Sequence, residues 1–356
     1  MDFFLKKKED ARWDLVAPTS MGVRLAPDGR QQVSRSYHFT MQATSAESNV
    51  LSVPAALGQR TEALTAFVKD SPISSFIKSE MRKRGIAYEG PDRDQGGPWG
   101  LRHQINFTES GVGGRGSQVA NDRAGEVGRT LSADDFDLDR IFGEEGVRIL
   151  HMSGLFDALS PQSGDFCLKL ARAAKKYGTR ISFDMNYRAS FWKGREKELG
   201  RIFRSLAEEA DILMNFQLLD EDGMPVFADL DPERPETFEK LMEGLQKAYP
   251  GASIITSTVR KELSACANKW GAIVLSEGKW YRAPLRRIDV LDRIGGGDGF
   301  ASGFLYGLLS GYDLESCLQL GWAAGAMAVT VLTDYAEPES EQVLRRIWQG
   351  SADVQR

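Results

Sequence analysis

The sequence predicts an α/β fold in which helices cover both faces of a mostly parallel central sheet. Short β-rich runs alternate with amphipathic helical patterns through the middle of the chain. The runs lie at 147–152, 179–184 and 212–215, and the helical patterns between them at 164–177 and 196–210. Strand–helix–strand repeats build parallel sheets whose ligands gather at the carboxyl ends of the strands. Asp184 and Asn215 stand at two such ends and are therefore candidate site residues.

Two earlier stretches interrupt this alternation and predict a small second sheet. They are rich in glycine or in short segments of alternating polarity, and we expect the second sheet to be built from about residues 24–42 and 99–123. A lid over a binding site would explain such a sheet, and a decorative edge hairpin would explain it equally well.

The composition indicates an ordinary globular protein whose partner is a small molecule. Of the 356 residues, 42% are apolar and 27% charged, and the net charge is −5. Because the chain has no basic excess, we do not expect it to bind nucleic acid. Cys167, Cys266 and Cys317 lack metal-ligand spacing and are expected to be core thiols in a reducing compartment.

The N-terminal residues do not have the pattern of a secretion signal. Lys6, Lys7 and Lys8 follow a very short apolar patch, which reverses the order found in signal peptides. No run of about 18 apolar residues, the length that spans a membrane, occurs in the chain. We therefore expect a cytoplasmic protein without a membrane segment, with a single domain over 14–346, a solvated leader over 1–13 and a tail over 347–356.

The glycine-rich stretch at 292–299 predicts a phosphate site at the start of a helix. Gly295, Gly296 and Gly297 allow the backbone to turn its N–H groups toward an anion, and an apolar helical pattern follows at once. Asp298 adds a carboxylate at the mouth of this anion hole. The pair suits phosphoryl transfer, in which the helix end stabilises phosphate charge while the carboxylate accepts a proton from a hydroxyl. No Gly-Lys-Ser/Thr follows, which excludes a Walker-type loop, and a plain helix connection is the alternative interpretation of the glycines.

Two apolar helices are expected after the glycine turn. In the first, glycines recur every four residues at 299, 303, 307 and 311, so they share one face. We expect that face to pack closely against the sheet. The second helix covers about 314–331, and its small residues between 323 and 328 also allow close approach to a neighbour.

These motifs together resemble the ribokinase-type (PfkB-type) carbohydrate kinases. The stretch from Asp292 to Asp298 is similar to the C-terminal signature of that family. Within the family the chain is most similar to the 2-keto-3-deoxygluconate kinases, because Asp184-Met185-Asn186-Tyr187-Arg188 precedes Phe191-Trp192, and because Asn121-Asp122-Arg123-Ala124-Gly125 resembles their Tyr-Asp-Arg-Ala-Gly. The similarity runs from about residue 15 to residue 343.

The resemblance implies a ribokinase-like, three-layer fold with a small β-sheet lid, and a kinase that uses ATP and Mg²⁺. It implies that Asp298 is the catalytic base and that Gly295, Gly296 and Gly297 form the anion hole. The implied substrate-binding residues are Ser45, Asn49, Arg102, Arg123, Arg188 and Asp298. The implied nucleotide-binding residues are Asn215, Thr258, Arg260, Gly295 and Gly297, and Asp184 and Asn186 would hold the metal indirectly. Pairing of lids implies a homodimer.

The chain departs from the family pattern mainly around the expected sugar pocket. Thr44-Ser45 stands in place of two glycines near the lid hinge, which reduces backbone freedom there. Asn121 and Asn106 stand where aromatic residues are expected in the lid. Leu218 replaces the acidic residue that follows the strand-end Asn215. Thr19-Ser20 stands in place of Gly-Glu at the end of the first strand. Thr333 stands in place of the glycine before Asp334.

Two functional hypotheses follow. In the first, the chain is an ATP-dependent kinase that phosphorylates a hydroxyl of a sugar or sugar acid, with a substrate like 2-keto-3-deoxygluconate favoured. In the second, it is a kinase-fold protein with little turnover that binds a sugar or nucleotide as a sensor. The kinase hypothesis is favoured because Asp298 and the three glycines are all retained.

Overall fold

A nine-stranded sheet forms the centre of the molecule in the computed structural model, which describes residues 4–350. Its strand order is β17-β16-β15-β12-β11-β10-β1-β4-β6. The strands from β15 to β6 pair in parallel, and β15, β16 and β17 form an antiparallel edge. The predicted mostly parallel sheet is therefore confirmed.

The strands expected from the sequence fall within a residue or so of their observed bounds. The nine strands of the main sheet are β1 (Trp13–Pro18), β4 (Thr61–Leu64), β6 (Ile86–Glu89), β10 (Val147–Ser153), β11 (Arg180–Asp184), β12 (Ile212–Met214), β15 (Ile254–Ser264), β16 (Ala267–Ser276) and β17 (Lys279–Asp289). Because successive side chains of a strand point to opposite faces, Leu150 joins one apolar core and Ile149 joins the other.

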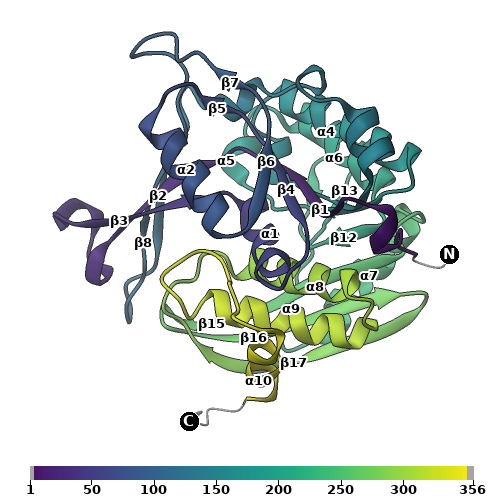
Figure 1. The fold of residues 1–356 in the computed structure, drawn as a ribbon. Coiled ribbons are helices and arrows are strands. Elements are labelled where there is room, and N and C mark those ends of the chain that lie inside the picture. Colours follow the sequence, from purple (N-terminus) through teal and green to yellow (C-terminus); the bar gives the residue numbers. More distant parts are fainter. Residues whose placement is uncertain (1–3, 351–356) are drawn as a thin grey trace.

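Helices cover both faces of the sheet (Figure 1). One core receives side chains from α3 (Gly154–Asp157), α4 (Pro161–Lys176), α5 (Ala189–Trp192), α6 (Glu196–Glu209) and α7 (Pro235–Ala248). The other receives them from α1 (Ala46–Ala56), α2 (Pro72–Lys83), α8 (Gly296–Leu309), α9 (Leu314–Ala328) and α10 (Glu341–Gln349). The last helix includes residues 347–349, which the sequence analysis places in the tail, and the tail residues from 351 on lie outside the described part of the chain.

A separate four-stranded sheet stands apart from the main sheet, as the two irregular stretches predicted. Its order is β3-β2-β8-β9. The strands are β2 (Gly22–Pro27), β3 (Phe39–Thr44), β8 (Ile105–Glu109) and β9 (Gln118–Asp122). In Figure 1, β2, β3 and β8 extend to the left of the main body. Two short pairs complete the strands: β5 (Phe67–Val68) with β7 (Asp92–Arg93), and β13 (Leu218–Leu219) with β14 (Pro225–Val226). The roles of the small sheet as a lid and as a dimer contact stay predictions.

The glycine face of α8 packs against a helix, so our expectation that it packs against the sheet is wrong. A Cβ added at Gly299 would lie 2.8 Å from the carbonyl oxygen of Ala324, and one at Gly303 only 2.5 Å from that of Leu320. Both carbonyls belong to α9, which ends at Ala328, three residues before the expected end. Larger α8 side chains, such as Phe300, fill the core instead. Because these glycines have no side chain, α8 and α9 can pack closely together.

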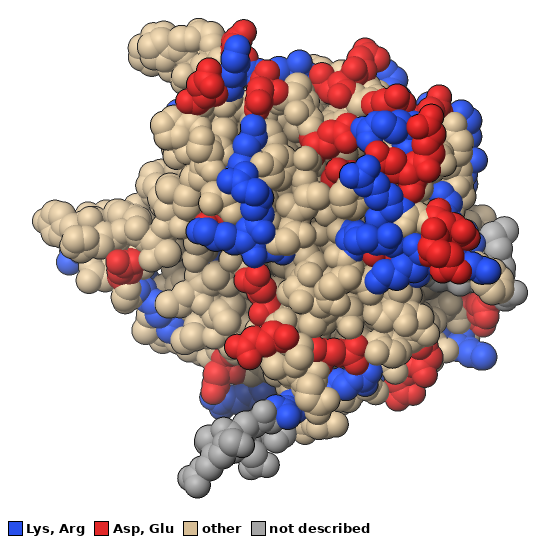
Figure 2. All heavy atoms as spheres, viewed as in Figure 1, with Lys and Arg blue, Asp and Glu red and all other residues tan. Residues whose placement is uncertain are grey.

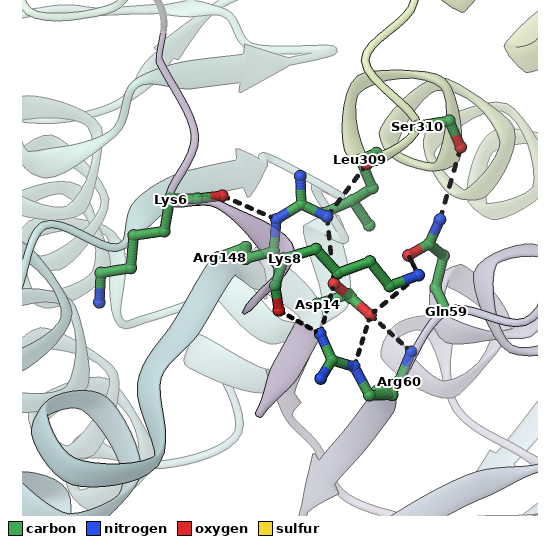
Figure 3. Close-up of polar contacts among 8 residues, drawn as sticks. All are labelled: Lys6, Lys8, Asp14, Gln59, Arg60, Arg148, Leu309 and Ser310. Carbon is green, nitrogen blue, oxygen red and sulfur yellow. Dashed lines mark hydrogen bonds and ion pairs between the residues drawn. The ribbon is translucent and has the colours of Figure 1, made fainter. Parts of the chain in front are cut away.

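A buried ion-pair network ties the N-terminal segment to the end of the sheet opposite that of Asp184 (Figure 3). Asp14, which is 0% exposed, accepts the backbone N–H of Arg60 at 2.9 Å and Nη1 of Arg148 at 3.1 Å. Arg148 also donates to the carbonyls of Lys6 and Leu309, each at 3.0 Å. Residues 1–3 lie outside the described chain, and two residues of the expected solvated leader, Lys6 and Lys8, contact this network.

Charged side chains of both signs are mixed on the molecular surface seen in Figure 2. This agrees with the small net charge of −5. Among residues 4–350, no helix is both long and apolar enough to cross a membrane.

Asp14→Asn should lower the free energy of unfolding by about 2–4 kcal/mol at pH 7, because Arg148 would keep its buried charge without a counterion. Burial opposes ionisation of Asp14, but hydrogen bonds from Arg60 and Arg148 outweigh it and lower the pKa of Asp14. The ionised carboxylate therefore stabilises the fold above the unfolded-state pKa, and this contribution is lost as the pH falls through the lowered value. Urea unfolding at several pH values measures the difference.

Lys8→Met is the matched control, since Lys8 is half exposed and its Nζ lies 3.9 Å from Asp14. We expect it to change stability by less than about 0.5 kcal/mol. Equal stability of Asp14→Asn and wild-type protein at pH 7 would contradict this account of the network.

Candidate active site

A cavity of about 670 Å³ lies where the small sheet faces the carboxyl ends of β11 and β12 and the start of α8. Most residues predicted to act at the site contribute to its wall. These are Ser45, Asn49, Arg123, Asp184, Asn186, Arg188, Asn215, Arg260, Gly295, Gly296, Gly297 and Asp298. Segments far apart in the sequence are therefore brought together at the one place that the strand-end and glycine-turn motifs indicate.

The glycine turn places the N-terminus of α8 in the wall of this cavity. Gly295 has a φ of 85°, and a Cβ at this position would lie 1.9 Å from the carbonyl oxygen of Asp334. Only glycine fits there, for conformational and for steric reasons. The helix begins at Gly296, so the amides of its first turn have no intrahelical partner and can bind an anion.

Asp298 lies in the first turn of α8, where its carboxylate faces other charged groups. Asn49 on α1 donates from Nδ2 to Oδ2 of Asp298 at 3.0 Å. Burial, together with the negative charges of Asp184 and Asp334, raises the pKa of Asp298 to about 8, although Asn49 and the positive charge of Arg188 oppose the rise. A carboxylate with a pKa close to neutral is well suited to accept a proton from a hydroxyl group.

Asp184 is held in place by two asparagines at the ends of neighbouring strands. Its Oδ1 accepts the backbone N–H of Asn186 at 2.9 Å, and its Oδ2 accepts Nδ2 of Asn215 at 3.1 Å. Asn186 and Asn215 have positive φ angles of 38° and 50°, a conformation that asparagine tolerates better than most residues. Burial raises the pKa of Asp184 to about 6, against the lowering effect of both asparagines and of Arg188.

The side chains of the cavity suit a Mg²⁺ ion held indirectly better than one bound directly by several protein ligands. Within residues 4–350, no group of three or more His, Cys, Asp or Glu side chains is arranged to bind a metal. The carboxylates of Asp184 and Asp298 and the amide of Asn186 do line the cavity. Mg²⁺ commonly keeps several waters and binds through substrate phosphates and one or two carboxylates, so these residues fit the ion.

Two arginines and an aromatic ring, Arg123, Arg188 and Phe191, form another part of the cavity wall. Arg123 donates from Nη1 to Glu126 at 2.8 Å, and its guanidinium lies 5.3 Å from the ring centre of Phe191. Arg188 donates to the carbonyl of Tyr187 at 3.0 Å, and no ion pair of Arg188 is found in the described chain. One arginine is thus fixed by its carboxylate partner, and the other has most of its donors available.

Another pair of arginines lies beside the glycine turn. Arg260 and Arg293 both line the cavity. Glu262 is hydrogen-bonded to Arg293, and it lies 3.5 Å from Nη2 of Arg260. Burial and the positive charge of Arg293 lower the pKa of Arg260. Arg260 and Arg293 thus share one carboxylate partner, Glu262, beside the glycine turn.

Three of the predicted site residues make contacts other than those that their expected roles imply. Arg102 is not part of the cavity wall, and it donates to Asp122 and to the carbonyl of Ala124, both at 2.6 Å. Thr258 lies one layer behind the wall and donates from Oγ1 to Asn215 at 3.1 Å. Ser45 reaches the cavity, but its Oγ caps α1 by accepting the N–H of Ser48 at 3.0 Å.

The position that lost its acidic residue lies in a short hairpin. Leu218 pairs with Val226 in the short β13–β14 hairpin. The nearby Asp220 accepts the N–H of Met224 at 2.8 Å within the turn of that hairpin. Neither residue is part of the cavity wall. The departure seen in the sequence therefore persists in the folded structure.

Sequence reasoning missed two side chains that connect the small sheet to the phosphate end. Arg24 on β2 forms a buried ion pair with Asp292, and Thr44 on β3 donates a hydrogen bond to Asp334. An arginine inside the apolar run from Val23 to Leu25 was the available signal for the first contact. No local pattern indicates the second, since its partners are 290 residues apart.

The sequence is similar to a family of kinases whose activity suits the cavity and its glycine turn. A family model for the pfkB family carbohydrate kinases matches residues 19–340. A 5-dehydro-2-deoxygluconokinase of Clostridium perfringens is 27% identical over 327 residues, covering 92% of this chain and 90% of that protein. A 2-dehydro-3-deoxygluconokinase of Bacillus subtilis is 30% identical over 294 residues, covering 82% of each chain.

Solved structures with a similar fold indicate the same family as the sequence comparisons. The crystal structure of 2-dehydro-3-deoxygluconokinase from Thermotoga maritima matches with a TM-score of 0.84 and 25% identity, covering 95% of this chain and all (100%) of that one. A ribokinase II structure from Escherichia coli, which contains ATP and Mg²⁺, has the same fold with a TM-score of 0.76 and 17% identity, covering 95% of this chain and 100% of the other. The predicted ribokinase-like fold is confirmed. The chain belongs to the PfkB family of carbohydrate kinases and is a sugar kinase.

Proposed function

We propose that this sugar kinase transfers the γ-phosphoryl group of ATP to a hydroxyl of a sugar acid that resembles 2-keto-3-deoxygluconate. One observation carries the proposal: Asp298 and the free amides of α8 share a single cavity with Arg123 and Arg188. The first two features suit phosphoryl transfer, and two guanidinium groups suit a carboxylate. The names of the relatives support a keto-deoxy sugar acid as the substrate class.

Asp298 acts as the general base in this mechanism. It accepts the proton of the attacking hydroxyl while that oxygen bonds to the γ-phosphorus and the bond between the γ-phosphorus and the bridging oxygen of ADP breaks. The amides of Gly296 and Gly297 and the dipole of α8 stabilise the charge on the transferring group. Asn49 keeps the carboxylate of Asp298 in one orientation.

Arg123 and Arg188 orient the acceptor by binding its carboxylate. Glu126 holds Arg123 in a defined position, while Arg188 is free to form a two-point contact. Asn49, Asn106 and Asp334 also line the cavity, and each keeps a buried oxygen without a hydrogen-bond partner. A ligand with several hydroxyl groups would satisfy such oxygens after small side-chain rotations.

ATP occupies the end of the cavity next to Arg260, Arg293 and the glycine turn. The net positive charge of the two arginines and Glu262 suits a polyphosphate. Asp184 and Asn186 would hold Mg²⁺, and the hydrogen bond from Asn215 would keep Asp184 in place for that purpose. When bound, Mg²⁺ neutralises charge on the phosphate oxygens.

Asp298→Asn should reduce kcat for the sugar acid by about a hundredfold or more, because asparagine cannot accept the hydroxyl proton. Binding of ATP, measured by calorimetry, should stay within about threefold of wild type, since the amides of α8 remain. ADP release in the presence of 2-keto-3-deoxygluconate measures turnover. Near-normal turnover of this variant would refute the assignment of the base.

The pH dependence of kcat/KM should follow ionisation of Asp298. Its pKa of about 8 means that the free enzyme gains active base as the pH rises from 6 to 8. We therefore expect kcat/KM for the sugar acid to rise by at least tenfold over this interval and to level off above it. The substrate carboxylate stays ionised throughout. A profile that is flat or falls between pH 6 and 8 would contradict the raised pKa.

Arg188→Met tests the proposed carboxylate site. We expect KM for sugar acids to rise by about tenfold or more, because a charge-assisted contact is lost, while KM for ATP stays within about threefold. Arg201→Met is a matched control, since Arg201 is an exposed arginine of α6. A panel of 2-keto-3-deoxygluconate, 5-keto-2-deoxygluconate, 2-keto-3-deoxygalactonate, ribose and fructose reports the substrate class. Preference of wild-type enzyme for the two neutral sugars would overturn the sugar-acid proposal.

A further inference from the structure

A buried ion pair joins the small sheet to the segment that leads into the glycine turn. Arg24 on β2 and Asp292 are each 1% exposed, and Nη2 of Arg24 donates to Oδ2 of Asp292. Two further contacts come from the small-sheet side: Nε of Arg24 donates to Thr108 at 2.5 Å, and Ser110 donates to Oδ2 of Asp292 at 2.9 Å. The small sheet thus surrounds one oxygen of this carboxylate with donors.

The other oxygen of Asp292 holds the backbone at the start of the turn. Its Oδ1 accepts the N–H of Ile294 at 3.1 Å, and the N–H of Asp292 donates to the carbonyl of Val329 at 3.2 Å. Ile294 and Gly295 both line the cavity. One side chain therefore connects the small sheet with the peptide that precedes the anion-binding amides.

Stability alone does not account for this pair. A buried ion pair is often no more stabilising than apolar residues of the same size, whereas removal of one partner leaves a costly unpaired charge. Nη1 of Arg24 has no hydrogen-bond partner, which adds to the cost of keeping an arginine at this position. Arg24 also lines the cavity. These features indicate a role at the site.

We propose that Arg24 is a positioning residue for phosphoryl transfer. Through Asp292 it fixes the peptide before Gly295, so that the amides of the glycine turn point at the transferring group. The inference rests on the proposed phosphoryl transfer at Asp298.

The test compares Arg24→Ala with wild type in the sugar-acid kinase assay. We expect kcat to fall by about tenfold or more, with KM for ATP and for the sugar acid within about threefold of wild type. The substitution leaves space for a guanidinium group next to Asp292. Guanidinium chloride at millimolar concentration should therefore restore part of kcat, while urea, which has the same planar shape without the charge, should not.

Arg115→Ala is the matched control. Arg115 also forms an ion pair near the small sheet, with Glu109, but it is not part of the cavity wall. We expect its kcat to stay within about twofold of wild type and to be insensitive to guanidinium. Thermal melts of all variants separate loss of fold from loss of positioning, because a purely structural role would lower the melting temperature without a guanidinium-specific gain in kcat.

Wild-type kcat in a folded Arg24→Ala variant, or equal recovery with urea, would overturn the inference. If Arg24→Ala does not fold, Arg24→Lys takes its place, since lysine keeps the charge but cannot contact Thr108 and Asp292 as a fork. A kcat at least about threefold below wild type with unchanged KM then supports the inference, and a wild-type kcat refutes it. Absence of sugar-acid turnover in wild-type enzyme would instead refute the proposed function.

Discussion

The close packing of α8 against α9 is the constraint on which the site depends. Gly299 and Gly303 leave no space for a Cβ between the two helices, so α8 cannot shift without a clash between backbones. The chain that leaves α9 then returns past the start of α8, and Gly295 rests on the carbonyl of Asp334. Closely packed interiors transmit such constraints over several contacts. The position of the anion-binding amides is therefore set by a helix–helix contact in the core.

The charge balance of the cavity explains how one site can hold both a base and anionic ligands. Asp184, Asp298 and Asp334 share the cavity, and their mutual repulsion adds to burial in raising the pKa of Asp298. Arg188 opposes that rise. In the proposed complex Arg188 also binds the substrate carboxylate. The same cation therefore takes part in acceptor binding and lowers the pKa of the base.

The small sheet is connected to the phosphate end by side chains rather than by a flexible glycine hinge. Thr44 stands where the family pattern has glycine, and it donates to Asp334, whose backbone supports Gly295. Ser45 uses its hydroxyl to cap α1. The two residues that departed from the family pattern thus link the end of β3 to Asp334 and cap the start of α1. The side chains of Thr44 and Ser45 make contacts that glycine could not make.

Local patterns in the sequence predicted the three central strands β10, β11 and β12, the helices between them and the glycine turn. The strands before Asp184 and Asn215, and the turn before Asp298, are specified by residue periodicity and by glycine conformations, which are properties of neighbouring residues. The resemblance added Asn49, Arg123 and Arg188, which the structure brings to the same cavity as Asp298.

Only the tertiary structure decided which distant side chains meet. Arg24 and Asp292 are 268 residues apart, and the glycine face of α8 packs on α9 instead of on the sheet. Arg102, which the resemblance implied to be a substrate-binding residue, is hydrogen-bonded to Asp122, and neither residue is part of the cavity wall. Such contacts depend on how helices and sheets pack and on which buried charges need partners. Periodicity along the chain carries no information about that choice, because it describes one element at a time.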